Sequence, residues 1–266
     1  MDRNVKVREI SAYLESVAPL EMKEDFDNVG LLVGLTERNV TKVLVALDIT
    51  DEVIEEACEM GAQMIVSHHP LFFSCKDIKD TDLTGKKIIR LIENSISAVC
   101  MHTNLDAAWW GVNTVLAGHL GLSNIRLLEK PDANPDSGEY GIPKFGTLDM
   151  PMEFADFLKL TKHSLSSNGL RYHDAGRMVE KVALCGGSGG NFLGEAHRQG
   201  CDTFVTADIK YNVFLDAREL GINLIDGDHF CTENVVCPTL KEKLLEGFPG
   251  LEVSISSIHS QAAKFF

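Results

Sequence analysis

The sequence predicts an α/β fold of two similar halves, each with a mixed or mostly parallel sheet. Short apolar runs alternate with amphipathic stretches, an order that favours parallel strands joined by right-handed crossovers. Two landmarks of this order recur at one offset, since Lys42 and Gly61 are followed 139 residues later by Lys181 and Gly200. The shared offset indicates a duplicated α/β unit, although two unrelated units of this kind also carry lysine and glycine at such places.

The apolar runs are short and continuous, which is typical of buried strands. The elements expected in the first half are strands at 43–47, 62–66 and 97–101 and helices at 51–60, 83–94 and 112–120. The second half repeats the order with strands at 181–184, 200–206 and 222–225. We therefore divide the chain into a first α/β half at 1–128, a linker at 129–140 and a second α/β half at 141–266. Proline, glycine, asparagine and aspartate crowd the linker.

Composition excludes several classes of protein. The chain has 266 residues, of which 44% are hydrophobic, enough for one large domain or two packed halves. A net charge of −14 repels phosphate backbones, so nucleic acid is an unlikely partner. We expect neither a membrane span nor a secretory signal. Seven cysteines without a CxxC pair point to a reducing compartment and a cytoplasmic protein.

Three apolar runs end in residues that bind metals, where open parallel sheets build their sites. His68 and His69 follow the run at 62–66, and Pro70 indicates that the chain turns there, so both rings can converge. Asp106 follows the run at 97–101. His229 and Glu233 follow the run at 222–225 and lie four residues apart, on one side of a first helical turn.

Three imidazoles and two carboxylates suit zinc, iron, manganese, cobalt or nickel and are a poor set for calcium. Five donors are too many for one catalytic ion, so we predict two divalent metal ions sharing bridging carboxylates. Such a pair activates water, which makes hydrolysis the expected chemistry. His102 is either a sixth ligand, an outer hydrogen-bond partner or an acid/base residue, and we favour the last two roles.

Three other features have two interpretations each. Cys231 lies between His229 and Glu233 and is either a structural thiol, which we favour, or a group near the metals. The run Gly186–Gly190 is either an anion cradle at a helix N-terminus or a tight turn between a strand and a helix. Trp109 and Trp110 either wall a pocket or pack in a core. A Ser-His-Asp hydrolase is disfavoured because the sequence has no GxSxG motif.

At these residues the chain resembles the NIF-three-like family, often described as GTP cyclohydrolase 1 type 2 homologues. The stretches that carry the resemblance are 27–34, 67–73, 102–106, 206–211 and 229–233. The resemblance implies two similar α/β halves with a dinuclear metal centre in the cleft between them, in the compact form without an inserted central domain. It implies a toroidal homohexamer, and it makes His68, His69, Asp106, His229 and Glu233 the metal ligands.

The chain departs from the family at a few places outside the five ligands. Asp228 stands where the family usually has glycine, and Ala207 and Asn212 replace a glycine and a histidine. The stretch 141–146 lacks the arginine that the family carries there. These departures put contacts with the substrate in doubt but leave metal binding little affected.

The function predicted on this basis is that of a dinuclear-metal-dependent hydrolase, with opening of the purine ring of a GTP-like nucleotide implied by the family. The residues alone support only metal-assisted hydrolysis, so a metal-dependent phosphoesterase is the near alternative. A non-catalytic metal-binding scaffold or regulatory protein uses the same ligands. A ring that encircles DNA needs a basic channel, which the net charge of −14 disfavours.

Overall fold

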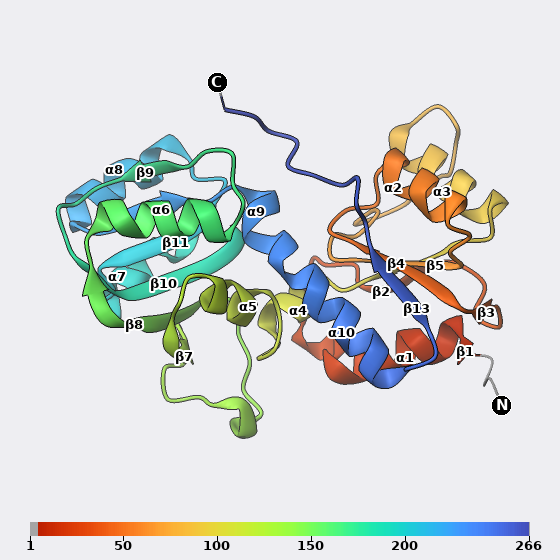
Figure 1. Cartoon of the computed structure of the whole chain (residues 1–266), viewed down its shortest axis with the longest axis horizontal. Helices are drawn as coiled ribbons and strands as arrows, with labels where there is room; N and C mark the ends of the chain where they lie inside the picture. The colour runs from red at the N-terminus through yellow and green to blue at the C-terminus, as the bar shows by residue number, and fades with distance from the viewer. Residues whose placement is uncertain (1–4, 266) are drawn as a thin grey trace. The chain divides into compact units, whose positions relative to one another are not determined.

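The computed structural model describes residues 5–265, which form two compact units. The first unit runs to Leu105 and resumes from Cys237 to Ser260. The second unit runs from Asp106 to Val236 and takes up the chain again from Gln261. Figure 1 labels the elements along the chain.

The first unit is built on a five-stranded sheet in the order β13-β4-β5-β6-β2. Its strands are β13 (Glu252–Ile255), β4 (Lys42–Ala46), β5 (Met64–Ser67), β6 (Ser97–Cys100) and β2 (Gly30–Val33). The first four are parallel to one another, and β2 is antiparallel to β6. The short strands β1 (Val5–Lys6) and β3 (Asn39–Val40) form a separate antiparallel pair.

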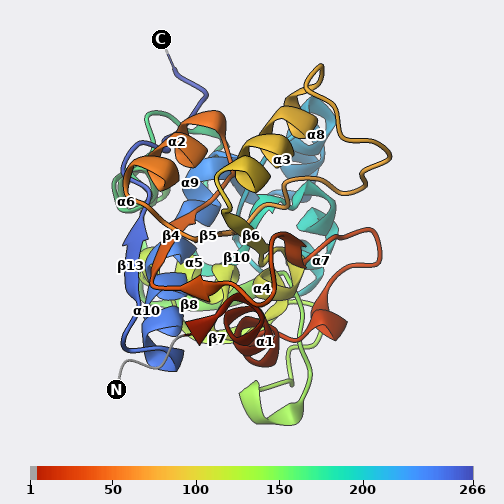
Figure 2. The same cartoon turned by 90° about the vertical axis from the view of Figure 1, so that its right-hand side faces the viewer.

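Helices cover both faces of this sheet. As Figures 1 and 2 show, α2 (Asp51–Glu59) and α3 (Leu83–Glu93) lie on one face, with α1 (Val7–Val17) and α10 (Cys237–Gly247) on the other. The short helix η1 (Leu20–Met22) follows α1. Both helices of the first pair begin at a capping side chain, because Thr50 accepts from the Val53 amide and Asp82 from the Gly85 amide. Two-sided coverage explains why β4, β5 and β6 read as continuous apolar runs.

The second unit has a six-stranded sheet in the order β7-β8-β10-β11-β12-β9. Its strands are β7 (Ser123–Leu127), β8 (Lys144–Met152), β10 (Val179–Ser188), β11 (Thr203–Ala207), β12 (Asn223–Asp226) and β9 (Arg171–His173). The three strands β10, β11 and β12 are parallel, whereas β7, β8 and β9 pair antiparallel. The sheet is therefore mixed, with a parallel centre.

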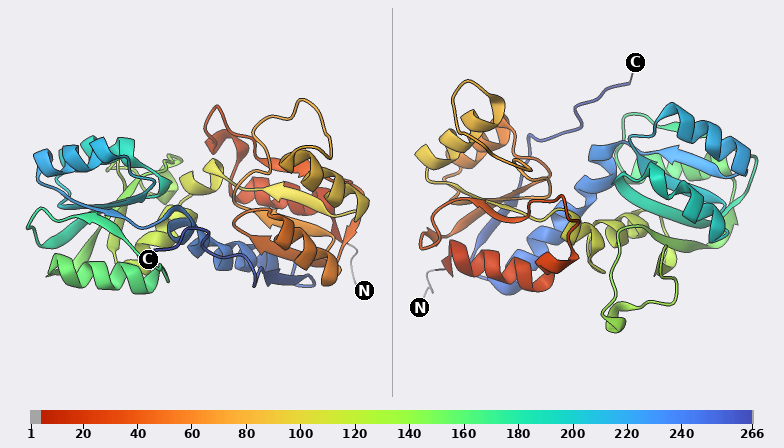
Figure 3. Two further views of the ribbon diagram at one scale, coloured as in Figure 1. Left: turned by 90° about the horizontal axis from the view of Figure 1, so that it is seen from above. Right: turned by 180° about the vertical axis from the view of Figure 1, so that it is seen from behind.

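One face of the second sheet packs against α5 (Val112–His119), α6 (Phe154–Ser164) and α9 (His229–Glu233). The other face packs against α7 (Leu193–Arg198) and α8 (Tyr211–Leu220), as the two views of Figure 3 show. The chain passes from the first unit to the second within helix α4 (Thr103–Ala107), and the short helices are η2 (Pro135–Ser137), η3 (Gly190–Phe192) and η4 (Asn234–Val236). No helix within residues 5–265 is long and apolar enough to cross a membrane.

The predicted mixed α/β fold is confirmed, and the repeat is visible in the backbone. Both sheets contain a parallel triplet in chain order, β4-β5-β6 and β10-β11-β12. The Gln63 amide donates to the Lys42 carbonyl, and the Asp202 amide donates to the Lys181 carbonyl, at the same offset of 139 residues. Gly61 and Gly200, which end the helices before β5 and β11, have φ of +67° and +73°. The two triplets therefore have equivalent hydrogen bonds as well as the same strand order.

The compact units do not coincide with the halves expected at 1–128 and 141–266. Strand β7 pairs with β8, which places α5 and β7 in the second unit. Strand β13 pairs with β4, so the chain after Val236 returns to the first unit. The stretch 129–140, expected as a linker between halves, connects β7 to β8 within the second unit.

Candidate metal centre

Three histidines gather at the carboxyl ends of neighbouring strands in the first unit. His68 and His69 follow β5, and His102 follows β6, which is parallel to β5 with Ser67 opposite Cys100. Their ring centroids lie 4.9 Å (His68–His69), 5.2 Å (His68–His102) and 5.5 Å (His69–His102) apart. One ligand atom from each of the three rings lies within 4.8 Å of the other two, so this group could hold a metal ion.

Each of these rings has its Nδ1 atom held by an oxygen acceptor. His68 Nδ1 is 2.8 Å from the Met101 carbonyl, His69 Nδ1 is 2.7 Å from Asp48 Oδ1, and His102 Nδ1 is 2.8 Å from Asp27 Oδ1. A carbonyl or carboxylate oxygen only accepts, so the ring proton lies on Nδ1. The lone pair of a neutral ring then lies on Nε2, which is the tautomer that metal-binding histidines need.

The two carboxylates that hold His69 and His102 are kept ionised by their hydrogen bonds. Burial raises the pKa of Asp27, but hydrogen bonds from His102 and Thr103 outweigh it and hold the pKa well below its usual value. Burial also raises the pKa of Asp48, and hydrogen bonds from His259 and His69 lower it by more. Both aspartates therefore stay charged and act purely as acceptors near neutral pH.

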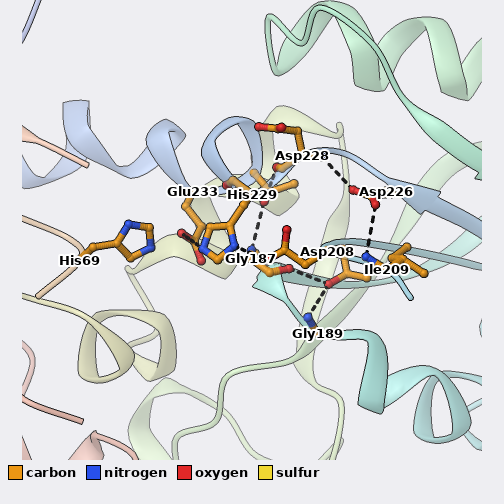
Figure 4. Close-up of polar contacts among 12 residues, drawn as sticks. His69, Gly187, Gly189, Asp208, Ile209, Asp226, Asp228, His229 and Glu233 are labelled. Carbon is orange, nitrogen blue, oxygen red and sulfur yellow. Dashed lines mark hydrogen bonds and ion pairs between the residues drawn. The ribbon is translucent and has the colours of Figure 1, made fainter. Parts of the chain in front are cut away.

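In the second unit, α9 presents His229 and Glu233 to the same point. Figure 4 shows the two side chains together, and His229 Nε2 lies 3.0 Å from Glu233 Oε2. Asp208, which follows β11, holds the Nδ1 atom of His229 at 2.7 Å, as the acceptors of the first unit do for their rings. The prediction that these two side chains lie on one side of a first helical turn is therefore confirmed.

Helix α9 begins at Asp228, whose φ of +73° lies in the region that glycine occupies most easily. Glycine, which the family resemblance predicts at this position, would adopt this conformation without strain. The Asp228 carboxylate accepts from the Cys231 amide at 3.2 Å, which caps the helix. Thr232, which also lies in the first turn, donates to the Asp228 carbonyl at 2.9 Å.

The glycine run at 186–190 covers the end of β10, where the pairing with β11 shifts between Leu184 and Ser188, and the start of η3. The amide of Gly186 donates to Asn113 Oδ1 at 2.8 Å, that of Gly187 to Thr232 Oγ1 at 3.0 Å, and that of Gly189 to Thr206 Oγ1 at 2.9 Å. These donors are already used within the protein, which disfavours an anion cradle. Gly187 has a φ of +62°, and a Cβ atom there would overlap the Glu233 carboxylate.

Asp106 lies on α4 at the start of the second unit and is buried. Burial raises the pKa of the Cys185 thiol, and the carboxylates of Asp106 and Glu233 raise it further. Both predicted carboxylate ligands therefore lie near the same buried thiol, within one unit.

Beside Asp106 lies Lys144, a fully buried lysine on β8. Its Nζ donates to the carbonyls of Asp106, Ala108 and Gly141 at 3.3–3.4 Å. Burial lowers its pKa to about 8. Lys144 belongs to the stretch 141–146, which lacks the arginine expected from the family resemblance. The lysine nevertheless places a buried cation in this stretch.

Cys231, on α9, packs in the apolar core of the second unit. Burial raises the pKa of its thiol to about 12, so it stays protonated near neutral pH. This supports the structural interpretation of Cys231. Trp109 donates from Nε1 to the Glu139 carbonyl at 2.9 Å, within the second unit.

The predicted ligands thus fall on both units: His68 and His69 on the first, and Asp106, His229 and Glu233 on the second. His102 joins the two histidines of the first unit. Sequence reasoning gave no role to Asp27, Asp48, Asp208 or Lys144. Asp48 and Asp208 follow apolar runs, as the histidines do, and that signal was available.

Comparison with known proteins confirms the predicted resemblance. A family model described as Duf34/NIF3 (NGG1p interacting factor 3) matches residues 5–263. A GTP cyclohydrolase 1 type 2 homolog of Clostridium perfringens is 40% identical over 98% of both chains. A second one, from Clostridium acetobutylicum, is 37% identical over 91% of this chain and 90% of that protein.

Solved structures agree with the sequence comparison. A hypothetical protein of Staphylococcus aureus has a TM-score of 0.90 at 32% identity, covering 99% of this chain and 100% of that one. A Bacillus cereus protein related to NIF3 has a TM-score of 0.90 at 25% identity, with the same coverage.

Proposed function

We propose that this chain, which belongs to the Duf34/NIF3 (NGG1p interacting factor 3) family, is a metal-dependent hydrolase. The ligands in this proposal are His68, His69, Asp106, His229 and Glu233, and they bind two divalent metal ions. The donors are imidazole nitrogens and carboxylate oxygens, which suit zinc, iron, manganese, cobalt or nickel.

One observation carries the proposal. All three imidazoles of the ligand set have Nδ1 held by an oxygen acceptor, namely the Met101 carbonyl, Asp48 or Asp208. Anchoring of this kind fixes the tautomer and orients Nε2, and it is typical of histidines that bind metals. Histidines on a protein surface have no such requirement.

When bound, two divalent ions would supply an activated water and a clamp for the oxygens of a displacement. The chain's own residues orient the ligands and move protons. The His102 ring, held through Nδ1 by the ionised Asp27, presents Nε2 to the histidine group and can accept a proton there and return it. Asp27 stabilises the charged form of that ring while it holds the proton.

Support for a substrate class comes from the names of the relatives, which are GTP cyclohydrolase 1 type 2 homologs. We propose a GTP-like nucleotide whose purine ring is opened by water. A phosphoester is the alternative substrate, because the same metal chemistry hydrolyses both. A metal-binding scaffold without turnover is the second candidate function, since it uses the same ligands.

Metal analysis of the purified protein, followed by turnover assays with GTP and with phosphoesters, tests these alternatives. The metal-loaded protein should convert GTP, and Asp106→Ala should abolish this conversion. Asp132→Ala, which removes an exposed carboxylate, is the matched control and should leave it unchanged. Turnover of phosphoesters alone would favour the phosphoesterase, and tight metal binding without turnover would favour the scaffold. A protein that binds no divalent metal would refute all three.

Homohexamer assembly is part of the same proposal, and light scattering on the purified protein tests it. The expected mass is that of six chains. Salt-dependent binding to duplex DNA would instead revive the DNA-encircling ring, which the net charge of −14 argues against.

A further inference from the structure

We propose that His259, on the segment that follows β13, is a positioning residue for His69 and acts through Asp48. The inference rests on the proposed function, because it concerns how one of the proposed metal ligands is held. All the residues that carry it belong to the first unit.

Asp48 accepts a hydrogen bond on each carboxylate oxygen. Its Oδ1 is 2.7 Å from His69 Nδ1, and its Oδ2 is 2.8 Å from His259 Nε2. The two rings are largely buried, with 20% of the His69 side chain and 13% of the His259 side chain exposed. The carboxylate is therefore held at two points, and it cannot rotate without breaking one bond or the other.

The segment that carries His259 is itself anchored to the first sheet. The Ser256 amide donates to the Val45 carbonyl at 2.8 Å, which extends the pairing of β13 with β4. Glu56, on α2, accepts from Ser256 Oγ at 2.5 Å and from the Ser257 amide at 2.8 Å. Ser256 Oγ in turn accepts from the His259 amide at 3.2 Å. These contacts fix the path of the chain just before the His259 ring.

The neighbouring aspartate shows that this arrangement is used twice. Asp27 holds His102 through Oδ1, and its Oδ2 accepts from the Thr103 amide at 3.0 Å. Thr103 is the residue next to His102, whereas His259 lies 211 residues from Asp48 in the chain. In both cases one oxygen orients the imidazole and the other fixes the carboxylate. His259 therefore does for Asp48 what the Thr103 amide does for Asp27.

The consequence concerns the orientation of His69. Without His259, Oδ2 of Asp48 loses its protein donor, and the carboxylate gains freedom to rotate away from His69. The His69 ring would then populate both neutral tautomers, and only the one protonated on Nδ1 can present Nε2 to a metal. Loss of His259 should therefore weaken metal binding, because its effect reaches His69 through Asp48.

Competition of Zn²⁺ with a chromophoric chelator measures the effect on the full-length protein. Outer hydrogen-bond partners of metal ligands typically contribute about 10- to 100-fold in affinity, so His259→Ala should weaken Zn²⁺ binding by about 10-fold. His259→Gln keeps an N–H donor at nearly the same place and should bind within about 3-fold of the wild type. His163→Ala, which removes an exposed histidine in the second unit, is the control and should bind Zn²⁺ as the wild type does.

A second readout does not depend on metal. The ¹⁵N chemical shifts of the His69 ring, recorded on the metal-free protein at a pH where the ring is neutral, report its tautomer. We expect one tautomer in the wild type and in His259→Gln, and a mixture in His259→Ala. Unchanged Zn²⁺ affinity together with a single His69 tautomer in a folded His259→Ala protein would overturn the inference. A wild type that binds no Zn²⁺ would refute the proposed function, and the tautomer measurement would still decide the role of His259.

Discussion

Substitution of Gly187 by alanine should displace the Glu233 carboxylate and so weaken metal binding. A Cβ atom at Gly187 would overlap Glu233 Oε1, and it would lie 3.0 Å from Glu233 Cδ and 3.1 Å from His229 Nε2. The atom that must move is the end of a flexible side chain, so the chain can still fold. The carboxylate would move away from the position where it meets His229.

The expected loss of stability has two parts. Gly187 has a φ of +62°, and a residue with a Cβ atom in this region costs about 1–2 kcal/mol. Forcing the buried Glu233 side chain to make room for a methyl group in a packed site typically costs about 1–3 kcal/mol. The free energy of unfolding should therefore fall by about 2–5 kcal/mol, and Zn²⁺ affinity should fall at least about 10-fold.

Two other glycines separate these parts. Gly61 and Gly200 have φ of +67° and +73°, and a Cβ atom at either position meets no atom within 4 Å. Alanine at Gly200 should cost only the backbone part, about 1–2 kcal/mol, and leave Zn²⁺ affinity unchanged. In a Glu233→Ala background, Gly187→Ala should cost no more than Gly200→Ala does.

Urea unfolding in the presence of a chelator measures the stability of the metal-free protein, and chelator competition measures its Zn²⁺ affinity. If Gly187→Ala bound Zn²⁺ as tightly as Gly200→Ala, the carboxylate would not need the space that glycine leaves. The close approach of Gly187 to Glu233 would then have no role in metal binding.

Three further predictions concern residues around the candidate metal centre. Lys144 has a folded pKa of about 8, below its usual 10.5, so the unfolded state binds more protons between these values and stability should rise with pH across them. Lys144→Met should remove this rise in unfolding free energy, which amounts to about 3 kcal/mol at most. Urea unfolding across this pH range measures the rise, and a pH dependence that the substitution leaves unaltered would contradict the prediction. The Asp27 pKa is lowered, so Asp27→Asn should cost on the order of 2 kcal/mol at pH 7, and the cost should shrink as the pH falls below about 4. Asparagine at position 208 would keep the φ of +52° but would lose the charge that holds His229. Asp208→Asn should therefore lower Zn²⁺ affinity about 10-fold, whereas the control Asp216→Asn should leave the affinity unchanged.

How much of the fold the sequence could predict depended on burial. Strands β4, β5, β6, β11 and β12 are buried on both faces, and their continuous apolar runs were recognised. Strand β9 (Arg171–His173) is largely exposed and pairs with β12 from the edge of the sheet, so its sequence carries no such signal. The return of β13 to β4 depends on a pairing across about two hundred residues, which no local pattern encodes.

The candidate site divides in the same way. His68, His69, His229 and Glu233 were recognisable because their residue types are uncommon together at strand ends. The lysine at 144 looks like a surface residue at the start of a strand, and only the tertiary structure shows three carbonyls around its ammonium group. His259 and Asp27 lie in loops far along the chain from the rings that they serve, so spacing could not reveal them.

Each unit anchors its histidine in the same way, but the repeat shows that equivalent positions play different roles in the two units. In the first unit Asp48, after β4, anchors His69, after β5, and in the second unit Asp208, after β11, anchors His229, after β12. In both cases the anchor comes from the end of the adjacent parallel strand. The offset of 139 residues makes Asp208 the equivalent of His69, and Gly187 the equivalent of Asp48.

The same strand end therefore carries a predicted ligand in one unit and an anchor in the other. The position that supplies a carboxylate in the first unit must be glycine in the second, because Glu233 occupies the space. A site built this way needs different residues at equivalent positions, so the two units cannot exchange roles. Substituting one unit's residue for its equivalent, as in Gly187→Asp, should consequently do more harm to metal binding than Gly187→Ala, since it adds both bulk and a like charge beside Glu233.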